Sequence, residues 1–243
     1  MRTKVALVTG AGKRLGLEAA RELGRRGYDI VAHVNGSVEG AQDLRGDLES
    51  RGRRVHVVQA DLGSEGGQDA LVAATKDFTN HLDAIVHNAG IFERVPFGEI
   101  DRARYARMQA INCEAPFFVT QGLLPELRAA GSACVVHVTD IAAERPLPAY
   151  AHYSVSKASL LMLTRALAVE LAPTIRVNAV APGTVMFPED FDAATRGRFL
   201  ARIPMGREGS AGDVATAVAY LVCDAAFVTG QVLAVDGGRS VAL

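Results

Sequence analysis

The chain has 243 residues, 49% of them hydrophobic, and contains no tryptophan. One large α/β domain commonly reaches this size without dividing, and a core built from Val, Leu, Ile and Ala suits a buried sheet covered by helices. Because the formal net charge is -1 and charges of both signs are interleaved, the sequence excludes a broad electrostatic surface for nucleic acid or for an anionic membrane.

Short apolar runs alternate with helical patterns along the whole chain. The apolar runs predict buried strands at residues 5–8, 30–34, 55–58, 84–86, 134–138, 175–180 and 232–235. Apolar periodicity between them predicts helices at residues 15–26, 38–50, 68–78, 105–129, 151–171 and 211–222. This order predicts a single-domain, doubly wound (Rossmann) α/β fold over residues 1–243, in which helices cover both faces of a mostly parallel, seven-stranded sheet. Functional loops should then meet at the carboxyl ends of the strands.

Residues 9–16, TGAGKRLG, follow the first predicted strand and open the first predicted helix. Gly10, Gly12 and Gly16 have the spacing of a dinucleotide-binding turn, in which glycine permits close approach of a pyrophosphate to the amides at a helix start. An ordinary tight turn is the alternative. The strand–turn–helix context favours nucleotide binding, with contacts extending to Leu15.

The end of the second predicted strand lacks the acidic residue that would bind the ribose 2′-hydroxyl of NAD. Asn35 and Ser37 lie there instead, and Lys13 and Arg14 are available from the glycine turn, so the sequence favours NADP(H). Asn35 and Ser37 are also residue types that cap helices. Asp61, after the third strand, accepts a hydrogen bond from adenine or caps the next turn, and the sequence does not decide between these roles.

Two further loops belong to the same predicted edge. Asn88, Ala89 and Gly90 follow the fourth strand in a compact turn that keeps bulky side chains away from a cofactor. Pro182 and Gly183 begin an irregular, proline-containing segment with a short helical pattern. We expect a mobile substrate loop at residues 182–204.

Tyr153 and Lys157 are four residues apart in the predicted helix 151–171, so their side chains project from one face. A tyrosine titrates near pH ~10, so acid–base catalysis at neutral pH needs a shift of roughly three units. Lys157 and an oxidised nicotinamide ring both lower the tyrosine pKa, and the lysine can also hold the nicotinamide ribose. This pair is common by chance, but the upstream glycine turn and Asn112 favour the catalytic interpretation.

With these motifs taken together, the chain resembles the short-chain dehydrogenase/reductase family. The matching features follow the family's order and comprise residues 9–16, Asn88-Ala89-Gly90, Asn112, Tyr153, Lys157, Pro182-Gly183, Thr229-Gly230 and residues 236–238. The resemblance implies that Tyr153 donates or accepts the proton, that Lys157 tunes it, and that Asn112 holds a proton-relay water. It also implies a homotetramer packed through the helices at 105–129 and 151–171.

Asp140 departs from the family pattern, because a carbonyl-polarising serine usually occupies the position thirteen residues before the tyrosine. An ionised aspartate only accepts hydrogen bonds, so it cannot replace a donor to a carbonyl oxygen, and it opposes ionisation of Tyr153. It suits a ligand rich in N–H groups. Capping of a turn at the strand end is the structural alternative.

Asp140, Tyr153 and Lys157 together resemble the pteridine reductase branch of that family. The branch places the arginine that corresponds to Arg14 near the cofactor phosphates and the pterin, and an aromatic residue at the position of Phe92 stacks on the pterin. The C-terminal VDGGRS at residues 235–240 is also typical of it. Phe92 is equally suited to packing. The branch carries a serine where this chain has Gly90.

The first hypothesis is therefore an NADPH-dependent reductase that converts a dihydropterin or dihydrofolate to the tetrahydro form by hydride transfer to a ring C=N. The alternative is an NADPH-dependent carbonyl or 3-oxoacyl reductase, in which Thr139 or water supplies the missing donor. A third hypothesis is a non-catalytic nucleotide-binding regulator, because fold alone does not establish activity.

The cysteines Cys113, Cys134 and Cys223 lie far apart without metal-ligand spacing, so we expect buried free thiols and no metal site. No uninterrupted apolar stretch reaches transmembrane length. Together these features predict a cytoplasmic protein that acts on a small molecule.

Overall fold

The computed structural model describes residues 2–186 and 192–242. Its centre is a seven-stranded sheet with strand order β3-β2-β1-β4-β5-β6-β7. Every neighbouring pair is parallel, so the prediction of a mostly parallel doubly wound sheet is confirmed and extended. The strands are β1 (Lys4–Thr9), β2 (Tyr28–Val34), β3 (Val55–Gln59), β4 (Ala84–His87), β5 (Ala133–Val138), β6 (Ile175–Pro182) and β7 (Val232–Val235).

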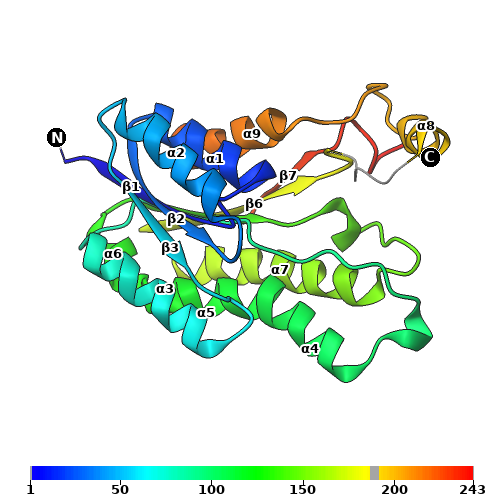
Figure 1. Cartoon of the computed structure of the whole chain (residues 1–243), viewed down its shortest axis with the longest axis horizontal. Helices are drawn as coiled ribbons and strands as arrows, with labels where there is room; N and C mark the ends of the chain where they lie inside the picture. The colour runs from blue at the N-terminus through cyan, green and yellow to red at the C-terminus, as the bar shows by residue number, and fades with distance from the viewer. Residues whose placement is uncertain (1, 187–191, 243) are drawn as a thin grey trace.

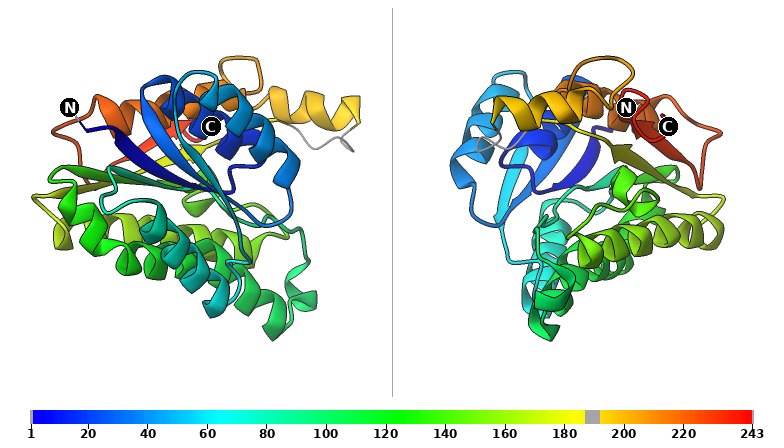
Figure 2. Two further views of the ribbon diagram at one scale, coloured as in Figure 1. Left: turned by 60° about the vertical axis from the view of Figure 1, so that its left-hand side comes forward. Right: turned by 90° about the vertical axis from the view of Figure 1, so that its right-hand side faces the viewer.

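Helices cover both faces of the sheet (Figure 1). One layer holds α1 (Arg14–Arg25), α2 (Val38–Glu49) and α9 (Ala211–Cys223), and the other holds α3 (Glu65–Phe78), α4 (Arg102–Gln109), α5 (Ala115–Gly122), α6 (Leu124–Ala129) and α7 (Ala151–Glu170). The two layers stay on opposite sides of the sheet in both views of Figure 2. An additional helix, α8 (Ala193–Leu200), follows β6.

Strand β1 shows how the sequence builds the two cores. Successive side chains of a strand point to opposite faces. Ala6 and Val8 accordingly pack in the cluster under α1, α2 and α9, whereas Val5 and Leu7 pack in the cluster on the other face. Because both faces are covered, nearly the whole of β1 is apolar, as expected for a buried parallel strand.

The prediction of one helix over residues 105–129 is wrong. The segment contains α4, a π-helical turn η2 (Ala110–Glu114), α5 and α6. Pro116 and Pro125 each lie in the first turn of a new helix. Proline lacks the N–H that a helix interior requires, so it is tolerated at a helix start and ends the preceding one.

The loops that follow β1, β4, β5 and β6 all lie at the carboxyl edge of the sheet. The chain winds outward from β1 in one direction and from β4 in the other, so the crevice of this fold opens between those strands. Part of the predicted substrate loop, residues 187–191, lies outside the described residues, and the rest includes α8.

Three global features can be stated for the described part of the chain. No helix within it is long and apolar enough to cross a membrane. It contains no group of His, Cys, Asp and Glu side chains that could hold a metal ion. All cysteines are free, but only Cys134 is buried, whereas Cys113 and Cys223 are half-buried, so the expectation of three buried thiols is wrong for two of them.

Candidate functional site

The glycine turn after β1 is folded tightly against its surroundings. A Cβ atom on Gly12 would lie 2.2 Å from the carbonyl oxygen of Ser37, and one on Gly16 would lie 2.2 Å from the carbonyl oxygen of Gly10. No side chain caps the start of α1, whose N-cap residue is Lys13. The first amides of this helix are therefore available to an anion, and the helix dipole favours negative charge there.

His33 and Asn88 hold this turn in place. The Gly10 amide donates to His33 Nδ1 at 3.2 Å, so His33 Nε2 carries the proton and donates to the carbonyl oxygen of Ala60 at 3.1 Å. Burial lowers the pKa of His33, which keeps the ring neutral. Asn88 Nδ2 donates to the carbonyl oxygens of Thr9 at 3.0 Å and Gly10 at 3.2 Å. The turn is thus braced by neutral groups from β2 and from the loop after β4.

Sequence reasoning did not find the role of His33. Its position at the carboxyl end of β2, next to the glycine turn in a parallel sheet, was the available signal.

The predicted phosphate-binding residues surround the mouth of the turn. Lys13, Arg14 and Asn35 are exposed, and no acidic residue is present at the end of β2. Ser37 is the N-cap residue of α2, but its side chain makes no capping bond. Arg14 adopts a φ of 51° and donates from Nη2 to the carbonyl oxygen of Met186 at 2.7 Å. Its side chain therefore bridges the glycine turn and the segment after β6.

Asp61 serves as a turn cap in this structure. Its Oδ1 accepts from the Gly63 amide at 3.0 Å, and its Oδ2 lies 3.6 Å from Arg107 Nη1. Asp61 is exposed, so its carboxylate remains accessible from solvent.

Asp140, Tyr153 and Lys157 come together at the end of β5. The Tyr153 hydroxyl donates to Asp140 Oδ2 at 2.8 Å, and Asp140 Oδ1 accepts from the Ala142 amide at 2.7 Å. The second bond caps the short 3₁₀ turn η3 (Ile141–Ala143), so the capping role anticipated for Asp140 is confirmed. Lys157 Nζ donates to the carbonyl oxygen of Val138 at 2.9 Å.

Burial shifts the pKa values of all three groups. Burial raises the pKa of Tyr153 well above its ordinary value, and the adjacent Asp140 carboxyl reinforces the shift. Burial also raises the pKa of Asp140, against the stabilising effects of the Ala142 amide, the Tyr153 hydroxyl and Lys157. Burial lowers the pKa of Lys157 to about 8, although Asp140 opposes this change. Tyr153 is therefore protonated and able to act as a donor.

Asn112 lies on the π-helical turn η2 and ties the loop after β4 to α7. Its Oδ1 accepts from the Ile91 amide at 2.9 Å, and its Nδ2 donates to Ser156 Oγ at 2.9 Å. A Cβ atom on Gly90 would lie 3.1 Å from Asn112 Oδ1 and 3.5 Å from Lys157 Nζ. Gly90 thus leaves space for the side chains of Asn112 and Lys157. The pteridine reductase branch that the sequence resembles has serine at this position.

An aromatic wall borders the hydroxyl of Tyr153. The ring of Phe92 stacks on Tyr150, with centroids 4.4 Å apart and an interplanar angle of 12°. The same ring meets Tyr153 edge-on at 4.8 Å. Phe92 remains 54% exposed, so it packs against its neighbours and still offers aromatic surface to a ligand. Tyr150 was not anticipated from the sequence.

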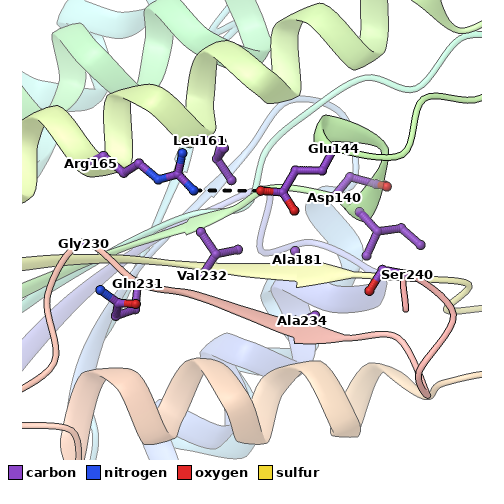
Figure 3. A pocket seen from close by; sticks show the side chains of 11 residues that line it. Asp140, Glu144, Leu161, Arg165, Ala181, Gly230, Gln231, Val232, Ala234 and Ser240 are labelled. Atoms are coloured by element: carbon purple, nitrogen blue, oxygen red, sulfur yellow. Dashed lines mark ion pairs between the residues drawn. The ribbon is translucent and has the colours of Figure 1, made fainter. Parts of the chain in front are cut away.

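A cavity lies beside Asp140 (Figure 3). This cavity of about 350 Å³ lies between α7 and the ends of β6 and β7, and Asp140 and Ser240 both line it. Glu144 and Arg165 form an ion pair across it at 3.8 Å. The C-terminal turn that carries Ser240 is thus adjacent to the loop that carries Asp140.

Pro182 and Gly183 fix that turn. Pro182 pairs with Val235 in the sheet, and the Gly183 amide donates to the carbonyl oxygen of Val235 at 3.0 Å. A Cβ atom on Gly183 would lie 2.6 Å from the Asp236 Cβ atom. Only glycine permits this close approach, so Pro182 and Gly183 hold the end of β6 against the turn after β7.

Known proteins are similar in sequence to this chain over nearly its full length. The sequence model of the family described as enoyl-(acyl carrier protein) reductase matches residues 10–240. Cis-4-hydroxycyclohexanecarboxylate dehydrogenase of Sinomonas cyclohexanicum is 38% identical, over 97% of this chain and 96% of its own length. Dihydromonapterin reductase of Klebsiella pneumoniae is 33% identical, over 96% of this chain and 95% of its own length.

A solved structure gives the same result in three dimensions. The blue fluorescent protein from a metagenomic library, crystallised in complex with NADPH, superposes with a TM-score of 0.89. It is 32% identical, and the match covers 97% of each chain.

Proposed function

The chain belongs to the short-chain dehydrogenase/reductase family of oxidoreductases, and from this premise we propose that it reduces dihydropterins or dihydrofolate to the tetrahydro form with NADPH. The observation that carries the proposal is the 2.8 Å hydrogen bond from Tyr153 to Asp140. It supports the proposal because a carboxyl acceptor next to the proposed proton donor suits a ligand with N–H groups, whereas a carbonyl substrate needs a donor there. A pterin ring has N–H groups that suit such an acceptor.

The residues around the glycine turn fit a dinucleotide. Gly10, Gly12 and Gly16 permit close approach of a pyrophosphate, and the uncapped start of α1 supplies donors. The absence of an acidic residue at the end of β2, with Lys13 and Arg14 exposed nearby, supports a 2′-phosphate and thus NADP(H). We assign further contacts to Leu15, Asn35, Ser37, Asp61, Asn88, Ala89, Gly90, Pro182 and Gly183. When bound, NADPH supplies the hydride that reduces the C=N bond.

The proton comes from the chain's own residues. Tyr153 donates the proton of its hydroxyl to the ring nitrogen, and the ammonium group of Lys157 stabilises the phenolate that remains. Asp140 accepts a hydrogen bond from a ring N–H and orients the pterin. Phe92 stacks on the flat ring, and Asn112 holds the relay water through which the tyrosine is reprotonated.

A substrate panel tests this proposal. Purified protein is assayed with NADPH and NADH against dihydrobiopterin, dihydrofolate and a simple ketone. We expect turnover of at least one dihydropterin, with NADPH preferred. Oxidation of NADPH with ketones and with no pterin contradicts the proposal.

The second candidate is an NADPH-dependent carbonyl or 3-oxoacyl reductase. Burial raises the pKa of Asp140, which shifts the carboxyl toward the protonated form that can donate a hydrogen bond to a carbonyl oxygen. The similarity to cis-4-hydroxycyclohexanecarboxylate dehydrogenase also supports it. Asp140→Ser separates the two candidates: it increases the activity of a ketone reductase and decreases that of a pterin reductase.

The assembly of the protein is part of the proposal. Large apolar side chains are exposed on α5 and α7, among them Phe118, Val155 and Met162. Exposed apolar surface of this kind supports packing between copies, and we propose a cytoplasmic homotetramer built through these helices. Sedimentation at several protein concentrations tests it. We also propose that residues 182–204 form the substrate loop.

A further inference from the structure

The turn after β7 is built to hold Arg239 in one place. The Asp236 carboxylate accepts from the Gly238 amide at 2.9 Å and from the Ser240 amide at 2.6 Å. Gly237 and Gly238 both adopt positive φ angles, of 62° and 87°. The Met205 amide donates to the carbonyl oxygen of Gly237 at 3.1 Å, so the segment after α8 packs on the turn.

The guanidinium of Arg239 lies between the end of β6 and α8. Its Nη1 donates to Thr184 Oγ1, directly after Gly183. Its central carbon lies 5.1 Å from the ring centroid of Phe199 on α8. The neighbouring Ser240 lines the cavity that Asp140 also lines. Arg239 is therefore a half-buried cation near the carboxyl ends of β6 and β7, close enough for the charge of Asp140 to act on it.

Among the described residues, Arg239 has no carboxylate within ion-pair distance. Arg202 adds a second positive charge close enough to repel that of Arg239, and it also lacks an ion pair with any described residue. Burial lowers the pKa of Arg239, and the repulsion from Arg202 adds to this effect, whereas Asp140 and Asp236 oppose it. Partly desolvated guanidinium groups bind carboxylate or phosphate well, because the planar fork donates two parallel hydrogen bonds.

We propose that Arg239, assisted by Arg202, binds an anionic group on the tail of the substrate whose ring reacts at Tyr153. This inference rests on the proposed function for the position of the ring, and it adds the substrate class: molecules that carry a carboxylate or a phosphate beyond the reacting ring. Arg239 would act as a specificity residue, without a part in hydride or proton transfer.

Arg239→Gln tests the proposal with three substrates. Dihydrofolate carries carboxylates, dihydroneopterin triphosphate carries phosphates, and dihydrobiopterin has an uncharged tail. Loss of a charge-assisted contact raises KM for the preferred anionic substrate roughly tenfold or more and leaves its kcat nearly unchanged. KM for dihydrobiopterin changes less than about twofold, since nothing on its tail meets the guanidinium. The anionic substrate with the larger rise identifies the tail chemistry.

Matched variants separate binding from damage to the fold. Arg128→Gln removes an exposed arginine on α6, distant in sequence from the C-terminal turn, and leaves all three KM values unchanged. Arg202→Gln gives a smaller rise than Arg239→Gln. Unaltered NADPH affinity and melting temperature show that the turn remains folded. An equal rise of KM for charged and uncharged pterins overturns the proposal.

A second substrate pair keeps this test independent of the pterin assignment. If wild-type protein reduces no pterin, 4-oxocyclohexanecarboxylate is compared with its methyl ester in wild-type and Arg239→Gln protein. If Arg239→Gln loses activity with the carboxylate substrate but keeps it with the ester, the anion site is supported although the proposed pterin reduction fails. If Arg239→Gln affects acid and ester alike, the anion site is wrong too.

Discussion

The glycine turn and the Asp140 site lie at the same edge of the sheet but are stabilised differently. At the glycine turn the braces are neutral: a neutral imidazole from His33, the amide of Asn88, and glycines whose Cβ atoms would collide with backbone. At the second site, three ionisable groups are buried together and their pKa values are displaced. The structure of the glycine turn depends on close backbone packing, whereas the properties of the Asp140 site depend on the charges of its buried groups.

This difference separates the effects that substitutions should have. A change at the glycine turn should alter cofactor affinity and the free energy of unfolding, because both depend on backbone geometry. A change at the second site should alter rate and pH dependence while the fold persists. Three experiments test this division.

The largest effect is expected for Tyr153→Phe. The variant loses the hydroxyl that donates to Asp140, and removal of a general acid lowers kcat by about 10³-fold. Steady-state and single-turnover rates measure the loss. NADPH affinity should stay within about twofold of wild type, because the phenyl ring is retained. Tyr220→Phe, on the exposed surface of α9, serves as the control, and a residual Tyr153→Phe rate above a tenth of wild type removes the tyrosine from the mechanism.

The pH profile gives the next largest effect. Burial lowers the pKa of Lys157 to about 8, so the ammonium that stabilises the phenolate is present below that pH and is lost above it. We expect kcat/KM to fall about tenfold per pH unit above pH about 8. Lys157→Arg should move this fall to higher pH, because a guanidinium stays charged. A profile that is flat to high pH, or unchanged in Lys157→Arg, argues against this role.

A smaller effect on binding and stability is expected for Gly16→Ala. The new Cβ atom would lie 2.2 Å from the Gly10 carbonyl oxygen, so the turn must shift. Such overpacking costs about 1–3 kcal/mol, and we expect weaker NADPH binding by roughly tenfold with little change in kcat at saturating NADPH. Urea unfolding and fluorescence titration measure both quantities.

Gly46→Ala provides the matched control in another helix. No atom lies within 4 Å of the Cβ position at Gly46 in α2, so alanine should stabilise the fold by about 0.5–1 kcal/mol and leave NADPH binding unchanged. If both alanine variants behave alike, close packing is not what Gly16 provides.

The same contrast explains what the sequence could predict. Apolar runs predicted all seven strands and the doubly wound fold, because a buried strand is a short run of consecutive apolar residues. The spacing of Tyr153 and Lys157 placed them on one helix face. The break of helix 105–129 was missed, although Pro116 and Pro125 signalled it, because the apolar pattern continues across the π-helical turn.

Contacts between residues distant in sequence could not be predicted. The bond from Gly10 to His33, the stacking of Phe92 on Tyr150 and the contact of Arg239 with Thr184 each join separate loops. They depend on tertiary geometry that no local pattern contains. Asp140, Tyr153 and Lys157 were thus predicted from the sequence, whereas the His33 contact at the glycine turn was found only in the structure.

The π-helical turn at residues 110–114 also determines the direction in which the side chains of α5 point. Each residue of an α-helix advances the direction of the side chains by about 100°, so one surplus residue offsets everything after it. Deleting one residue here would rotate α5 relative to α4 and turn Phe117 and Phe118 away from their outward direction. The burial of Asn112 and the outward direction of the α5 side chains therefore both depend on the number of residues in this turn. Deleting a single residue would disturb both at once.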